Sequence, residues 1–172
     1  LLGLFGKNQK RRLALLLAGA TVPAVVVGVL LESAAESAFR SINLVSFNLI
    51  LVAIVMMLAE RYAARDKLKL PTEKVGVKQA TIIGLAQSAA IVPGISRSGA
   101  TITAGIFMGL DRVAATRFSF LLSIPITVGA ILKVLVSNDS LSQISNQPML
   151  FVVGVVSACL SGALAIKFYL AT

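Results

Sequence analysis

One short stretch of the chain carries the side chains with the clearest capacity for chemistry. It reads VPGISRSGAT and runs from Val92 to Thr101. A helix-breaking Pro-Gly pair comes first, and Arg97 then stands between Ser96 and Ser98. Arginine offers five donors in a planar fork that matches phosphate, and serine is a favoured cap at the start of a helix. The pattern predicts a turn followed by a helix whose N-terminus, together with Arg97, binds an anion, most naturally phosphate.

The composition around this stretch is that of a membrane protein. Of the 172 residues 57% are hydrophobic and 13% are charged, and the mean hydropathy is +0.91, whereas soluble domains are roughly 45–50% apolar. The net charge of +9 comes from short basic clusters between apolar runs, and the chain has no Trp and only 2 Tyr for stacking on bases. We therefore expect no nucleic-acid partner and assign the positive charge to anionic lipid headgroups.

The chain contains no histidine and one cysteine, Cys159. Histidine-based catalysis and histidine metal sites are therefore excluded within these residues. A single cysteine also excludes an intrachain disulfide and fits no metal-ligand spacing.

Four mostly uncharged runs are long enough to cross a bilayer, which takes about 20 apolar residues in a helix. The expected spans are residues 13–31, 41–59, 118–136 and 148–167, and a basic cytoplasmic loop is expected over residues 60–78. Pro23 lies inside the first span, where it predicts a kink more than a break. Together the spans predict a single membrane domain over residues 1–172.

The segment over residues 79–110 has two candidate topologies. It forms either one long helix through Arg97 or a re-entrant hairpin that turns at Pro93-Gly94 and returns to the same side. Lysine and arginine collect in cytoplasmic loops, and the hairpin leaves only Arg40 on the opposite face from the other loop bases. The sequence therefore predicts an all-α, polytopic helical bundle with a re-entrant helix-turn-helix hairpin and with Arg97 at membrane depth.

The stretch GLAQSAAIVPGISRSGATITAGIFMGLDRVAATRFSFLLSIP, from Gly84 to Pro125, resembles the second signature region of the bacterial undecaprenyl-diphosphatase family, also called bacitracin-resistance proteins. Weaker resemblance extends through TVPAVVVGVLLE and ALAIKFYL. It implies a phosphatase of the bacterial inner membrane that converts the C55 isoprenoid diphosphate to the monophosphate and recycles the lipid carrier of cell-wall peptidoglycan synthesis. It also implies an inverted-repeat architecture in which two re-entrant hairpins meet.

The family's other signature, a Glu/Gln-x-x-x-Glu pair followed by Pro-x-Ser-Ser/Thr and a histidine, is not found in this sequence. Glu32 and Glu36 stand in a different context and do not replace it. We therefore expect the chain to be the C-terminal two-thirds of such an enzyme, without its N-terminal repeat and inactive by itself. The resemblance implies a divalent cation, Mg²⁺ or Ca²⁺, with its ligands in that other repeat, and no metal ligand in this chain.

The chemistry of the turn, taken together with the resemblance, assigns roles to these residues. The expected catalytic residues are Arg97, Ser96 and Ser98. The expected phosphate-binding residues are Arg97, Ser98, Gly99, Thr101 and Gln87. The isoprenoid tail is expected along apolar grooves lined by residues such as Phe107, Met108 and Phe118.

Other interpretations stay open at this level. A transporter or flippase for a phosphate-bearing lipid is the alternative function, because transporters also aim the N-termini of broken helices at anions. In a purely structural module, Arg97 would clamp backbone carbonyls and the serines would only cap a helix. Besides the lipid substrate and membrane lipids, a second copy of the chain remains a candidate partner, since small-residue helix faces serve contacts within and between chains alike.

Overall fold

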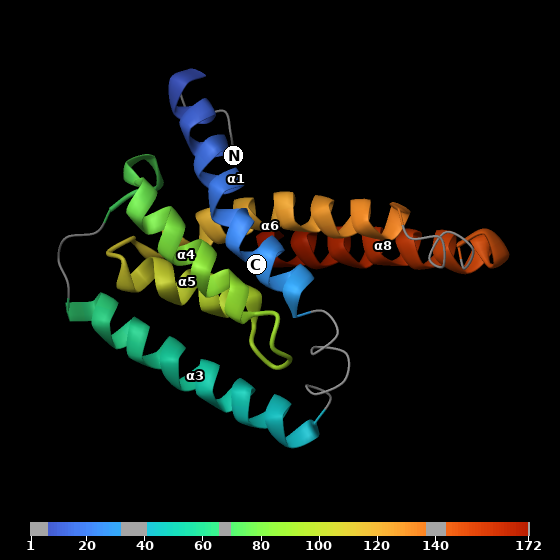
Figure 1. Cartoon of the computed structure of the whole chain (residues 1–172), viewed down its shortest axis with the longest axis horizontal. Coiled ribbons are helices and arrows are strands. Elements are labelled where there is room, and N and C mark those ends of the chain that lie inside the picture. The colour runs from blue at the N-terminus through green and yellow to red at the C-terminus, as the bar shows by residue number, and fades with distance from the viewer. Residues whose placement is uncertain (1–6, 32–40, 66–69, 137–143, 172) are drawn as a thin grey trace. The chain divides into compact units, whose positions relative to one another are not determined.

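The computed structural model describes residues 7–31, 41–65, 70–136 and 144–171, and it confirms the all-α fold class (Figure 1). The elements are α1 (Lys7–Leu30), α3 (Ile42–Arg65), the 3-10 helix η2 (Thr72–Lys74), α4 (Val77–Ala89), α5 (Arg97–Phe107), α6 (Arg112–Val136) and α8 (Pro148–Ala171). These residues divide into two compact units, Leu1–Gly129 and Ala130–Thr172. The hairpin and the buried core belong to the first unit.

Among the described residues, four helices are long and apolar enough to cross a membrane, as a polytopic membrane protein requires. These stretches are Asn8–Leu30, Ile42–Ala64, Arg112–Val136 and Pro148–Phe168. All four of these helices exceed the expected spans, because α1 begins at Lys7, α3 continues to Arg65 into the expected loop, α6 begins at Arg112 and α8 continues to Ala171. Absence of charge marks the part of a helix in hydrocarbon, whereas lysine and arginine are good helix formers that extend the helix into the interface.

The segment around Arg97 forms two helices and not one. α4 ends at Ala89, and the chain turns through Gly94, whose φ of 89° lies in the left-handed region that favours glycine. α5 then starts at Arg97. The two outer ends of this hairpin meet, since the Leu70 N–H donates to the Gly109 carbonyl at 2.8 Å and the Asp111 N–H donates to the Leu70 carbonyl at 3.1 Å. The chain therefore enters and leaves the hairpin at the same end.

α1 runs alongside α4 in the same direction (Figure 1). A Cβ added at Gly84 would lie only 2.3 Å from the carbonyl oxygen of Ala20. Farther along, a Cβ added at Gly28 would lie 3.9 Å from the Ile91 side chain. The absence of a side chain at Gly84 thus lets the two backbones touch, and α1 supports α4 from its middle to the turn.

α3 closes the other side of the hairpin and packs against α5 (Figure 1). The buried Asn48 donates from Nδ2 to the carbonyl oxygen of Pro93 at 2.8 Å. A Cβ added at Gly94 would lie 2.5 Å from the carbonyl oxygen of Val45. Backbone contact and one amide hydrogen bond therefore hold the tip against α3.

The core lies toward the end of the hairpin opposite its tip. Its completely enclosed side chains include Phe118 and Leu122 of α6, Ile83 of α4 and Val75. At the same end Arg112 of α6 forms an ion pair with Glu60 of α3. The C-terminal end of α3 and the start of α6 are therefore neighbours. None of the described core residues comes from the tip between Ala90 and Ser96.

Candidate anion site at the hairpin tip

The N-terminus of α5 is formed by the serine that precedes Arg97. Ser96 has extended backbone angles, with φ of −66° and ψ of 120°, and its Oγ accepts a hydrogen bond from the Gly99 N–H at 3.1 Å. The Ser98 Oγ lies 3.4 Å from the Ser96 Oγ. Both serine side chains are exposed, so their hydroxyl groups are accessible at the positive end of the α5 dipole.

The Arg97 side chain is exposed beside these serines. Among the residues that the structure describes, its guanidinium has no ion pair and no hydrogen bond. The Thr101 hydroxyl group donates to the backbone carbonyl of Arg97, not to its side chain. The described carbonyls are therefore not clamped by this side chain. Its five donors remain available to a ligand at the mouth of α5.

The backbone donors of the first turn fall into two groups, those that bond within the protein and those without an intrahelical partner. Gly99 gives its N–H to the Ser96 Oγ, and Ala100 gives its N–H to the Ser96 carbonyl at 2.8 Å. The N–H groups of Arg97 and Ser98 are the first-turn donors that a helix leaves without an intrahelical partner. Gly99 was expected to bind phosphate, but its N–H is engaged. A Cβ at Gly99 would lie 3.1 Å from Ser96 and 3.2 Å from the Met56 Sδ, so packing accounts for this glycine.

Thr101 points inward and not toward the open end of the site. It is 1% exposed, and its Oγ1 lies 2.6 Å from the Oγ of Ser119 on α6. The same oxygen donates toward the Arg97 carbonyl at 2.9 Å and toward the Ser98 carbonyl at 3.3 Å. The hydroxyl group expected to contact phosphate therefore ties the first turn of α5 to α6. Ser119 and Asn48 are not among the expected site residues, and the only sequence signal for either is a polar side chain inside an apolar run.

Gln87 lies on the last turns of α4, and its side chain is 3% exposed. Within the described part of the chain its Nε2 has no hydrogen-bond partner. A buried amide donor without a partner costs about 1–3 kcal/mol, so such a group calls for an explanation. A phosphate oxygen or an ordered water at the hairpin would supply the missing acceptor.

The described residues do not fit a divalent cation. No group of three or more His, Cys, Asp or Glu side chains lies together among them. The turn from Ala90 to Thr101 also contains no carboxylate in its sequence. Protein sites for Mg²⁺ and Ca²⁺ usually include at least one carboxylate, so we assign no metal ion to these residues.

An apolar groove of about 280 Å³ leads away from the tip between α3, α4 and α5. Gly99 and Ala100 line its end near the site, and Phe107 lines it farther along α5. The expectation that Phe107 borders an apolar groove is confirmed. The same expectation for Phe118 is wrong, because this ring is completely buried in the core and does not reach a surface groove.

Comparison with known proteins places the chain in a defined group. The sequence model of the family described as bacitracin resistance protein BacA matches residues 2–172. An undecaprenyl-diphosphatase of Methanothermobacter thermautotrophicus is 45% identical over 150 residues, which are 87% of this chain and 82% of that protein. An undecaprenyl-diphosphatase of Rubrobacter xylanophilus is 44% identical over 160 residues, which are 93% of this chain and 58% of that protein. A third relative, from Chloroherpeton thalassium and of the same name, is 46% identical over 136 residues, or 74% of this chain and 48% of the relative.

The relatives differ in how much of their length this chain spans. It covers 58% and 48% of the Rubrobacter and Chloroherpeton proteins, but 82% of the Methanothermobacter protein. The expectation that the chain represents two-thirds of such a protein therefore does not hold for all of them.

Proposed function

Because the chain belongs to the bacitracin resistance protein BacA family, we propose that it takes part in the hydrolysis of undecaprenyl diphosphate to undecaprenyl phosphate and inorganic phosphate. In this reaction water cleaves the phosphoanhydride bond, and the products keep all the oxygen atoms of the diphosphate and of the water. The substrate is a lipid, and four apolar helices put the chain in the membrane where that lipid resides. Regenerating the monophosphate would return the carrier lipid to cell-wall synthesis.

The observation that carries this proposal is the arrangement at the start of α5. An exposed arginine without a described partner, two exposed serine hydroxyl groups and the open N-terminus of α5 lie together at the hairpin tip. Few arrangements other than an anion site make use of all three. A diphosphate supplies the negative charge and the many acceptor oxygens that such donors need.

In the proposed mechanism the residues of this chain bind and polarise the diphosphate. The Arg97 guanidinium holds two phosphate oxygens in its planar fork, and the N–H groups of Arg97 and Ser98 face the same charge. The hydroxyl groups of Ser96 and Ser98 donate to further phosphate oxygens. Phosphoryl transfer depends mainly on positioning and on stabilising charge in the transition state, and fixed donors supply both.

Two buried side chains complete this assignment. We assign Gln87 as a secondary phosphate ligand, supported by its buried amide nitrogen without a partner among the described residues. Thr101 is a positioning residue, because its hydroxyl group is bound to Ser119 and to the carbonyls of the first turn of α5. The Thr101 side chain then acts on the substrate only through the geometry of Arg97 and Ser98.

The hairpin formed by α4 and α5 is proposed to be re-entrant. Its outer ends meet at Leu70 and Leu110, beside the Glu60–Arg112 ion pair. Charged residues gather at this end, whereas the segment from Ala86 to Ser96 is uncharged. In a bilayer the charged end would lie at the basic, cytoplasmic interface, and the tip would lie at depth. Non-helical backbone at that depth must be enclosed by protein or wetted, which agrees with a polar site.

Purified full-length protein in proteoliposomes tests this function. Undecaprenyl diphosphate is supplied in the membrane, and both the release of phosphate and the movement of the headgroup across the bilayer are followed. We expect phosphate release that saturates with substrate. Headgroup movement without hydrolysis would contradict the phosphatase and identify a lipid transporter that uses the same anion site.

A further inference from the structure

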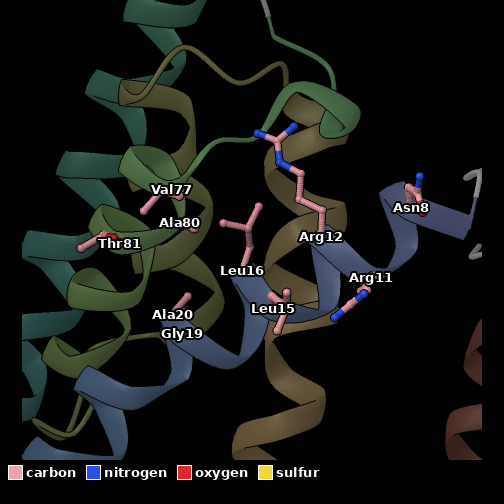
Figure 2. A pocket seen from close by; sticks show the side chains of 10 residues that line it. All are labelled: Asn8, Arg11, Arg12, Leu15, Leu16, Gly19, Ala20, Val77, Ala80 and Thr81. Atoms are coloured by element: carbon pink, nitrogen blue, oxygen red, sulfur yellow. The ribbon is translucent and has the colours of Figure 1, made fainter.

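A second groove lies at the opposite end of α4 from the hairpin tip. It has a volume of about 540 Å³ and runs between the N-terminal half of α1 and the first turns of α4 (Figure 2). Its lining combines two charged side chains, Arg11 and Arg12, with mainly apolar residues below them. No part of the proposed reaction uses this groove.

The α1 wall of the groove has a regular order. Arg11, Leu15 and Gly19 follow one another at intervals of four residues, and so do Arg12, Leu16 and Ala20. Residues four apart lie above one another on the same face of a helix, about one turn or 5.4 Å apart. From the interface inward the wall therefore presents guanidinium groups, then large apolar side chains, then Gly19, where the groove stays open. Ala20 closes the groove, because it is buried against Gly84 of α4.

The α4 wall is apolar and shallow. Val77 and Ala80 line it together with the polar Thr81, and Figure 2 shows Leu16 of α1 directed toward these residues. A Cβ added at Gly19 would meet nothing within 4 Å, so this part of the groove is open space and not a helix contact. The apolar hollow is therefore continuous with the two arginines.

We propose that this groove binds an anionic phospholipid, with its phosphate on Arg11 and Arg12 and an acyl chain against Leu15, Leu16 and Gly19. The candidate span of α1 begins at Asn8, so the two arginines stand at the level of lipid headgroups. Guanidinium groups suit phosphate, and the apolar hollow below them suits a hydrocarbon chain. The charge of the two arginines and their position at the membrane interface thus both favour an anionic phospholipid.

This site is separate from the anion site at the tip. About 12 Å of helix lies between Thr81 in the groove and Ala89 at the end of α4, at 1.5 Å per residue. The proposal does not rest on the phosphatase activity. A lipid in this groove would bridge α1 and α4, the helix pair that supports the hairpin.

The test uses the full-length protein in neutral detergent and native mass spectrometry with added phosphatidylglycerol or phosphatidylcholine. We expect the protein to retain phosphatidylglycerol in preference to phosphatidylcholine. The double variant Arg11→Gln/Arg12→Gln should bind phosphatidylglycerol about 30-fold more weakly, since each surface arginine contributes roughly 1 kcal/mol to binding of anionic lipid. The control Arg61→Gln/Lys74→Gln removes the same charge from exposed positions outside the groove and should bind as the parent does.

A second variant fills the hollow and keeps both arginines. Gly19→Leu should weaken retention of phosphatidylglycerol, whereas Gly154→Leu, at an equally open position in α8, should not. If the double arginine variant fails to fold, the comparison of Gly19→Leu with Gly154→Leu still tests whether the groove binds the lipid. The proposal would be overturned if both double variants lost phosphatidylglycerol binding equally, or if Gly19→Leu bound this lipid as the parent does. A parent protein with no preference for phosphatidylglycerol would also overturn it. Displacement of phosphatidylglycerol by undecaprenyl phosphate would likewise overturn it, because the groove would then belong to the isoprenoid lipid.

Discussion

The Thr101 Oγ1 and the Ser119 Oγ lie 2.6 Å apart in a buried contact between α5 and α6. From the same position Thr101 also reaches the carbonyls of Arg97 and Ser98. The orientation of the first turn of α5 is therefore fixed by a residue on another helix. Because that turn carries the donors of the proposed anion site, the buried Thr101 hydroxyl group can control how well these donors are oriented.

Loss of this contact should lower turnover more than it weakens substrate binding. In the full-length enzyme Thr101→Val and Ser119→Ala should each reduce kcat up to about 10-fold, the equivalent of one hydrogen bond of roughly 0.5–1.5 kcal/mol. Thr101→Ser keeps the hydroxyl group and should restore most of the rate. Steady-state kinetics with undecaprenyl diphosphate measure kcat and KM separately. A lower melting temperature with unchanged kcat would show that the contact serves stability alone.

Arg97 should be the most sensitive residue of the site. Removing one preorganised donor of this kind typically costs on the order of 100- to 1,000-fold in turnover, so Arg97→Ala should approach inactivity. Arg97→Lys keeps the charge but loses the planar fork and should also be badly impaired. Ser96→Ala and Ser98→Ala should lose less, since each gives up one neutral hydrogen bond. Phosphate release by purified, folded protein measures the activity of each variant and so ranks the variants. Near-parental activity of Arg97→Ala would contradict the assignment of Arg97 as a phosphate ligand.

Gly84→Ala should destabilise the protein by about 1–3 kcal/mol, the usual cost of forcing extra atoms into a packed contact. The added methyl group would meet the Ala20 backbone at 2.3 Å, and backbone cannot rotate away. The control is Gly129→Ala, where a Cβ meets nothing within 4 Å, and which should be neutral or slightly stabilising. Thermal unfolding in detergent compares the two. Equal melting temperatures would show that α1 and α4 can move apart at Gly84 without a loss of stability.

The proposed re-entrant topology of the hairpin predicts which positions face the outside of an intact cell. In a Cys159→Ser background, Lys74→Cys and Val113→Cys should be protected from an impermeant thiol reagent, while Asn146→Cys should react. Lys74 and Val113 flank the hairpin at its charged end, and both are exposed in the structure. Labelling at Val113→Cys from outside would mean that the segment crosses the membrane. Labelling after permeabilisation verifies that each cysteine is reactive.

Several features follow from the sequence because they depend on local chemistry. Pro93-Gly94 breaks a helix wherever it stands, and Ser96 caps the next one through its own backbone neighbours. Long uncharged runs predict membrane helices because the bilayer requires about 20 apolar residues in succession. The proximity of Ser96, Arg97 and Ser98 could also be predicted from the sequence, since adjacent residues in one turn stay together in any fold.

Other features were decided only by tertiary structure, because they join residues far apart in the chain. The sequence alone could not show that Thr101 turns inward to Ser119, and this packing of α5 on α6 is the reason why we propose Thr101 as a positioning residue. The contact from Asn48 to the Pro93 carbonyl spans 45 residues and left no signal beyond one amide in an apolar run. Hydrophobicity and propensity determined which segments become helices, whereas the close fit between their surfaces determined which donors remain free for a ligand.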